Sequence, residues 1–291
     1  METTKILDFE NNGVCMAADG EFLYLGSEGA INKYCLDDMS LTAHILLNSK
    51  KKKAVYTWLF FQIYDEYIFA YDFCTLHIVL KKDLQLLYSV RLGENVSSDI
   101  LGVLDFNYPN VYVGIRGGKV DVLNIETKNV TRLEVSDSSS WSRCVNENRM
   151  YYSTTNGALL ELERYTMREI RKVQLTKNMN IYSVVFHNDM LYTTAEKTFN
   201  IVDVNTFEAF RVVPDVMYHT ESKIIGIYGE TFVVAEYQKI SLFDTQTLEL
   251  RERFDFPTGY RHMREAYLAG DKLYGSDGHG IYCRILNHGN L

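Results

Sequence analysis

The sequence predicts an all-β protein made of seven similar units, each with four short antiparallel strands. A strand-like motif recurs about every 41 residues, and each copy is followed by a hairpin turn and a second strand of alternating polar and apolar residues. Dividing the 291 residues by seven gives about 41.6 residues per unit, whereas six units would need about 48 and eight about 36. The length and the repeat therefore agree on seven.

The recurring motif is an apolar residue, then usually a tyrosine, then an apolar or small residue. Tyrosine at one fixed place in most units is expected to fill the space between neighbouring sheets rather than to stack on a cofactor. The motif is anchored at residues 24, 68, 112, 151, 192, 233 and 274, with intervals of 44, 44, 39, 41, 41 and 41.

Four strands can be assigned to each unit in a constant order. An apolar strand such as 181–186 precedes the anchor strand, and a turn that often carries glycine, such as 155–157, follows it. The third strand alternates, as in 240–244, and leads into a polar turn that ends in threonine. The fourth strand, for instance 248–256, leaves that turn. We expect the Asp or Asn of the turn to accept hydrogen bonds from its backbone. Three such turns are 124–127, 203–206 and 244–247.

Four short strands in a repeat of this length, with tight turns and no helical period, are typical of a β-propeller blade. A sandwich or barrel is the alternative, but neither requires a 41-residue repeat. We predict a single domain over residues 1–291, a seven-bladed β-propeller. Its blades are predicted at residues 12–48, 54–92, 99–135, 140–175, 180–213, 221–256 and 262–287.

The two ends of the chain are predicted to meet in the last blade. The last unit has strands at 272–276 and 281–286 and leaves no room for a fourth strand. Residues 4–9 precede the first unit and would supply that missing outer strand. Such closure removes the exposed edges that an open ring would leave.

Residues 111–135 (VYVGIRGGKVDVLNIETKNVTRLEV) and 191–213 (LYTTAEKTFNIVDVNTFEAFRVV) resemble the repeats of YVTN or quinoprotein-like seven-bladed propellers, and more loosely WD-repeat blades. The resemblance extends over the whole chain at the level of the repeat. No copy has the Trp-Asp ending or Gly-His start of a WD repeat, the double glycine of kelch blades, or the tryptophan-docking motif of quinone-dependent dehydrogenases. The resemblance therefore implies the fold and carries over no catalytic residue.

Composition narrows the class of protein. The net charge of −8 disfavours a broad nucleic-acid-binding face. The five cysteines are widely spaced and never form a C-x-x-C pair, so we expect buried free thiols rather than disulfides or a zinc site. No apolar run is long enough to cross a membrane, and residues 1–5 lack the features of a signal peptide. We expect a cytoplasmic protein, monomeric on its own.

The loops that lead into the first strands are predicted to gather on one face of the propeller, around a central channel. Four of the residues predicted at the start of these strands, named below, are three cations and one tyrosine. On an otherwise negative chain, they would favour an anionic ligand or an acidic peptide. Alternatively, each cation pairs with a nearby carboxylate such as Glu147, Glu221 or Glu265. The candidate binding residues are Trp141, Arg143, Tyr182, His219, Lys223, Arg261, His262 and Arg264. Four of them fall at about the same position in consecutive blades: Arg143, Tyr182, Lys223 and Arg264.

We predict no catalytic residue, metal site or cofactor. His262, His279 and Asp277 of the last blade could hold a metal or carry out acid–base chemistry, but the spacing between the two histidines is not that of a ligand motif.

The favoured function is a non-enzymatic scaffold that binds a protein or acidic peptide on the loop-bearing face. The alternative is a hydrolase-like or lactonase-like propeller enzyme, or a small-ligand receptor, with its site at the channel mouth. The entries of the first strands offer Arg, Lys, Tyr and Cys rather than the convergent Asp, Asn and Glu that a channel calcium would need. Single-stranded nucleic acid bound across the basic rim is a third, weaker alternative.

Overall fold

The structure is a computed structural model of the 291-residue chain. It describes residues 2–8, 15–27, 29–47, 59–72, 74–93, 100–135, 142–177, 179–219, 221–257, 266–277 and 279–286. Over these ranges the chain forms 28 β-strands and no α-helix. Accordingly, the described residues include no helix long and apolar enough to cross a membrane.

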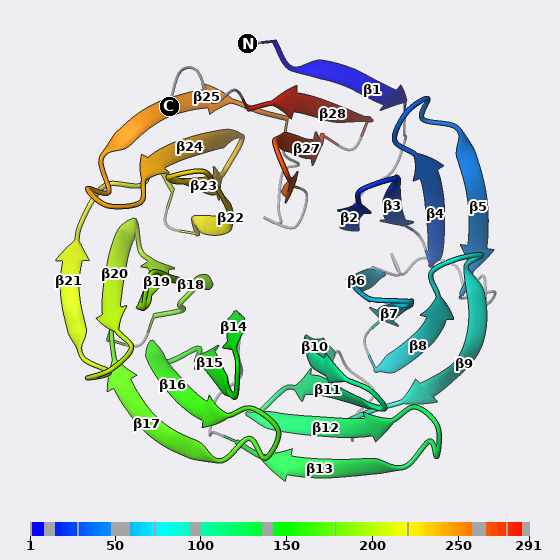
Figure 1. Ribbon diagram of the computed structural model, residues 1–291, viewed down its shortest axis with the longest axis horizontal. Helices are drawn as coiled ribbons and strands as arrows, with labels where there is room; N and C mark the ends of the chain where they lie inside the picture. Colours follow the sequence, from blue (N-terminus) through cyan, green and yellow to red (C-terminus); the bar gives the residue numbers. More distant parts are fainter. Residues whose placement is uncertain are drawn as a thin grey trace. The chain divides into compact units, whose positions relative to one another are not determined.

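The strands form seven four-stranded antiparallel sheets, and each sheet is one blade of a seven-bladed β-propeller (Figure 1). The prediction of an all-β propeller with four-stranded blades is therefore confirmed. The chain divides into two compact units, one formed by Met1–Phe106 and Pro257–Asn287 and the other by Asn107–Phe256 and His288–Leu291. The boundary at residue 106 falls within the first strand of blade 3.

Blades 1, 2 and 7 lie in the first unit. Blade 1 contains β2 (Cys15–Asp19), β3 (Phe22–Ser27), β4 (Ala30–Cys35) and β5 (Leu41–Leu46). Blade 2 contains β6 (Phe60–Tyr64), β7 (Tyr67–Asp72), β8 (Thr75–Leu80) and β9 (Gln85–Arg91). Blade 7 contains β26 (Ala266–Ala269), β27 (Lys272–Ser276), β28 (Gly280–Ile285) and β1 (Thr4–Asp8).

Blades 3 to 6 follow in chain order. Blade 3 contains β10 (Ile100–Asn107), β11 (Asn110–Ile115), β12 (Lys119–Asn124) and β13 (Val130–Glu134). Blade 4 contains β14 (Arg143–Asn146), β15 (Arg149–Ser153), β16 (Ala158–Glu163) and β17 (Glu169–Gln174). Blade 5 contains β18 (Ser183–His187), β19 (Met190–Ala195), β20 (Thr198–Asp203) and β21 (Ala209–Val213). Blade 6 contains β22 (Lys223–Tyr228), β23 (Thr231–Glu236), β24 (Lys239–Asp244) and β25 (Leu250–Asp255).

The strand pairing gives the repeat a fixed register. In every blade the anchor of the second strand lies opposite the fourth residue of the third strand, as Tyr24 does with Lys33 and Tyr274 with Cys283. In blade 2 the residue at this place is Phe69, opposite Ile78, so placing the anchor at Ile68 was wrong by one residue. In most blades the anchor is a tyrosine, but in blade 2 the tyrosine, Tyr67, is the first residue of the strand. The one-residue error therefore cannot be recognised from the sequence.

The anchor side chains are core residues, as predicted. Alternation along a strand turns every second side chain toward the adjacent blade, where an aromatic ring fills the space between two sheets. The anchors of the seven blades are all buried: Tyr24, Phe69, Tyr112, Tyr151, Tyr192, Val233 and Tyr274. The five cysteines form no disulfide and are half-buried rather than fully buried.

Strand β1 forms the outer strand of blade 7 by pairing antiparallel with β28, with Thr4 opposite Cys283 and Asp8 opposite Gly280 (Figure 1). Its Ile6 side chain packs on the apolar cluster that contains Tyr274. The predicted closure of the last blade by the start of the chain is confirmed, while Phe9, included in the prediction, lies outside the described residues.

The polar turns close as expected. The side-chain oxygen of Asp244 accepts the backbone N–H groups of Gln246 (2.8 Å) and Thr247 (2.7 Å). Asp203 and Asn124 do the same in their own blades. Because these N–H groups stabilise the carboxylate form, the hydrogen bond from Thr247 most of all, the pKa of Asp244 falls from its ordinary 3.8 to about 2, with help from Arg251.

Acid should therefore weaken blade 6. A lowered pKa in the folded state means that the contribution of Asp244 to stability is present above pH 3.8 and disappears as the pH falls to about 2. In urea unfolding, Asp244→Asn should be less stable than wild type near neutral pH, and this difference should shrink as the pH falls through that range. A difference that stays constant with pH would contradict the role given to the ionised carboxylate.

Candidate functional site

Three of the predicted binding residues lie where the first strands of blades 4, 5 and 6 begin. Arg143 is the first residue of β14 and Lys223 the first of β22. Tyr182 immediately precedes β18, and its backbone N–H donates to the carbonyl of Thr194 (2.9 Å). All three residues are half-buried, and the three first strands contact one another in succession. We call this end of the sheets the loop face.

The register refines the predicted alignment of these residues. Lys223 lies opposite Ala235, and the equivalent place in blade 5 is taken by Ser183, opposite Thr194. Tyr182 is thus one residue before this position, and Arg143, opposite Tyr152, is one residue after its counterpart, Ser142. Because side chains alternate along a strand, Arg143 and Lys223 point to opposite faces of their sheets. The cations are therefore distributed along the loop face rather than stacked at one level.

Buried hydroxyl groups connect the starts of these strands. The Ser142 side-chain oxygen accepts the N–H of Val184 in the next blade (3.0 Å), and the Ser183 oxygen accepts the N–H of Ile224 (3.1 Å). The Thr194 hydroxyl donates to the carbonyl of Ser222 (2.6 Å). A buried backbone group costs free energy unless it is paired, so these bonds hold each strand start against its neighbour. Arg143, Tyr182 and Lys223 are presented from a fixed backbone.

His219 lies in the loop before β22, which is held by a buried carboxylate. The side chain of Glu236 is fully buried and accepts the backbone N–H groups of Tyr218 and His219, the latter at 3.0 Å. Arg253 donates to its other oxygen (3.2 Å). The His219 ring stacks on Tyr237 with 5.7 Å between ring centroids. The loop is thereby fixed, and His219 has a structural part in it.

Tyr218 is the most accessible aromatic residue of this loop. It is 50% exposed. The charged ends of Lys239 and Arg253 lie 5.3 and 5.8 Å from its ring centroid, within the range of cation–π attraction. An exposed ring on a fixed backbone loses little conformational entropy when a partner covers it.

Acidic groups lie among the cations of the loop face. Burial raises the pKa of the Tyr182 phenol, a hydrogen bond with Asn180 opposes this, and the carboxylates of Glu221 and Glu196 raise the pKa further. The phenol therefore stays protonated near neutral pH and can donate a hydrogen bond. The loop face carries both signs of charge.

The other predicted site residues are Trp141, Arg261, His262 and Arg264, and they lie outside the described residues. Of the weaker metal candidate, Asp277 uses one oxygen to accept the N–H of His279 (2.8 Å) and the other to accept the hydroxyl of Tyr282 (2.8 Å). Within the described ranges, no group of three or more His, Cys, Asp or Glu side chains is placed to hold a metal ion.

Sequence reasoning missed Glu236 and the bridging hydroxyls. Glu236 ends a strand in which all six residues are buried, and a carboxylate at the buried end of such a strand needs partners. A glutamate at the end of an apolar strand was therefore the feature of the sequence that could have identified it. Ser142 and Ser183 gave none, because their partners are 42 and 41 residues further along the chain.

Strand order and register together define the class of protein, a seven-bladed β-propeller. No protein-family model matches the sequence. No curated protein matches it either.

Solved structures resemble the chain over nearly its whole length. A chain of the mitotic checkpoint complex aligns with a TM-score of 0.77 and 11% identity, covering 98% of this chain and 91% of that one. The computationally designed Ika8 protein aligns with a TM-score of 0.68 and 13% identity, covering 97% and 99%. BamB from Moraxella catarrhalis aligns with a TM-score of 0.67 and 11% identity, covering 100% and 98%. At these identities the likeness concerns the fold alone.

Proposed function

We propose that this protein is a non-enzymatic scaffold that binds a protein partner, through an acidic segment, on the loop face. The observation that carries the proposal is that three consecutive blades present Arg143, Tyr182 and Lys223 from strand starts that buried hydroxyls hold together. A guanidinium, a phenol and an ammonium group all donate hydrogen bonds to carboxylates. Tyr218 adds an exposed aromatic ring, a residue type that often anchors protein interfaces.

A fixed backbone favours recognition of a partner. Binding groups that are already in place spare the partner the entropy of ordering them. One of the solved structures with this fold is, by its name, part of a multi-protein complex, and this too supports a protein partner. The acidic character of the partner rests on Arg143 and Lys223 being cations on a chain of net charge −8.

Reversing the two charges should abolish capture of the partner. We expect the Arg143→Glu, Lys223→Glu double variant to retain about one tenth or less of the wild-type amount of a co-purifying protein, because carboxylates on the loop face repel an acidic segment. The measurement is quantitative mass spectrometry of proteins captured by each form, with the melting temperature measured in parallel.

The matched control makes the same change of charge away from the loop face. Lys82 and Lys172 are exposed, the first in the turn after β8 and the second on β17. The Lys82→Glu, Lys172→Glu variant should capture the partner as wild type does. Undiminished capture by the Arg143→Glu, Lys223→Glu variant, or an equal loss in the control, would reject the proposed surface.

A further inference from the structure

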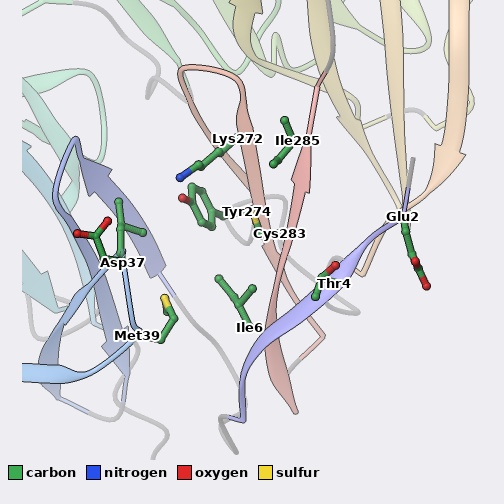
Figure 2. Close-up of a pocket in the computed structure, with 10 residues that line it drawn as sticks. Glu2, Thr4, Ile6, Asp37, Met39, Lys272, Tyr274, Cys283 and Ile285 are labelled. Atoms are coloured by element: carbon green, nitrogen blue, oxygen red, sulfur yellow. The ribbon is translucent and has the colours of Figure 1, made fainter.

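A cavity of about 530 Å³ opens between the sheet of blade 7 and the turn after β4 in blade 1 (Figure 2). Alternate residues of β27, β28 and β1 form one wall, among them Tyr274 and Ile6, and Leu36, Asp37 and Met39 form the other. The volume is within the range of small-ligand sites. Both walls belong to one compact unit.

Elsewhere in the protein a cation from one blade spans the corresponding gap. Lys33 of blade 1 donates to the carbonyls of Lys81 (3.3 Å) and Lys82 (2.9 Å), in the turn between the third and fourth strands of blade 2. Arg171 of blade 4 reaches the same turn in blade 5, at the carbonyls of Val204 (2.8 Å) and Asn205 (2.6 Å).

A third example joins blades 5 and 6, where Arg211 donates to the carbonyl of Thr247 (3.4 Å). The long aliphatic stems of these cations suit such gaps, because they cover apolar surface while the charged end binds carbonyl oxygens. In three gaps of the propeller, therefore, a Lys or Arg side chain of one blade binds backbone carbonyls of the next blade.

Blade 7, like blades 2, 3 and 6, has no cation at this pair of positions. Lys33 is the fourth residue of the third strand, and Arg171 and Arg211 lie opposite the fourth residues of their own third strands. In blade 7 the same pair of positions is occupied by Cys283 and Thr4. Neither side chain is charged or long enough to span the gap, and both line the cavity.

The far side of the gap retains the groups that a cation would bind. Leu36 and Asp37 directly follow the third strand of blade 1, as Lys81 and Lys82 do in blade 2 and Val204 and Asn205 in blade 5. Among the described residues, none donates to the carbonyls of Leu36 and Asp37, and none forms an ion pair with the Asp37 carboxylate.

The phenol of Tyr274 is a further polar group that a ligand in the cavity could bind. Tyr274 is only 2% exposed, lines the cavity, and forms no side-chain hydrogen bond with any described residue. In Figure 2 its hydroxyl is directed toward the side of the cavity on which Asp37 lies. The rest of the Tyr274 side chain is buried, and its hydroxyl oxygen is available from the cavity as a hydrogen-bond acceptor for a ligand.

We infer that the cavity binds a guanidinium or alkylammonium cation on an aliphatic stem, supplied by a free small molecule or by a side chain of another protein. The cation donates hydrogen bonds to the carbonyls of Leu36 and Asp37, pairs with the Asp37 carboxylate and satisfies the Tyr274 hydroxyl. Its stem lies against Ile6 and Met39. Lys272, also in the lining, opposes the cation and limits the affinity.

The test is calorimetric titration of the full chain with n-butylguanidinium, with butyrate as the anionic counterpart. Wild type should bind the cation saturably at millimolar concentration and should not bind butyrate. Asp37→Asn should weaken binding about tenfold, the effect of losing a hydrogen bond to a charged group. Lys272→Met should strengthen it, because the repulsion disappears.

Thr4→Arg places an arginine at the position of Arg171 and Arg211 and should abolish binding of the cation by filling the cavity from within. Thr131→Arg is the matched control, because Thr131 lies opposite Val122, the fourth residue of the third strand of blade 3, and thus at the same register position. It should leave the affinity unchanged. If Thr4→Arg does not fold, the affinities of the Asp37→Asn and Lys272→Met variants for n-butylguanidinium test the inference.

Absence of saturable binding by wild type, tighter binding of butyrate, or an affinity indifferent to Asp37→Asn would overturn the inference. A blocked peptide with a single central arginine distinguishes the two sources of the cation. Binding of this peptide as tightly as n-butylguanidinium indicates a side chain of a partner, whereas binding of n-butylguanidinium alone indicates a free small molecule.

Discussion

Deletion of residues 1–9 should lower the free energy of unfolding by about 5 kcal/mol, a large share of the stability of a typical domain. The deletion removes β1, leaves β28 as an exposed edge strand, and withdraws Ile6 and Leu7 from the apolar cluster around Tyr274. Each lost apolar side chain accounts for roughly 1.5–3 kcal/mol if fully buried, and each backbone hydrogen bond for about 1 kcal/mol. Urea unfolding of the two forms measures the difference.

A permuted chain provides the control for this deletion. Moving residues 1–9 behind the last residue through a short flexible linker restores β1 next to β28 with an unchanged set of contacts. This form should recover most of the lost stability. A truncated protein that unfolds at the wild-type urea concentration would show that β1 does not hold blade 7 together.

Glu236→Ala should be the most damaging substitution near the loop face, with a loss of about 3–5 kcal/mol. It leaves Arg253 without the carboxylate that it binds, and it leaves the N–H groups of Tyr218 and His219 without an acceptor. Glu236→Gln should cost less, because the amide oxygen still accepts hydrogen bonds. Equilibrium urea unfolding gives both values.

The same substitution should release the loop that carries Tyr218. Amide hydrogen exchange at Tyr218 and His219 should accelerate in Glu236→Ala, because their N–H groups have lost the buried acceptor. Glu249→Ala removes an exposed carboxylate of the same blade and should change neither stability nor exchange. Unchanged exchange in Glu236→Ala would mean that the loop is held by other contacts.

The sequence was enough to predict the blades because each blade repeats the same local sequence pattern. Alternation, a buried anchor residue and an Asp or Asn that caps a turn act within about 41 residues, so they recur visibly. The closure by β1 also followed, since a strand was missing at one end of the repeat and spare at the other.

Contacts between blades could not be predicted in this way. Ser142 looks like an ordinary loop residue until its partner Val184 in the next blade is known. The cavity in blade 7 depends on Thr4 lying opposite Cys283, a pairing between the two ends of the sequence whose register no local pattern specifies. The residue types and region of the candidate site therefore stay a prediction from the sequence, while the contacts that support its strand starts and the cavity beside blade 7 required the structure.

Photo-crosslinking is the most direct test of the loop face as the binding surface. Tyr218 lies before the first strand of blade 6, whereas Tyr165, 40% exposed, lies in the turn between the third and fourth strands of blade 4, at the opposite end of an antiparallel blade. Benzoylphenylalanine would replace either tyrosine in otherwise wild-type protein. We predict that the captured partner crosslinks from position 218 and not from position 165; crosslinking from position 165 with equal or greater yield would contradict binding on the loop face.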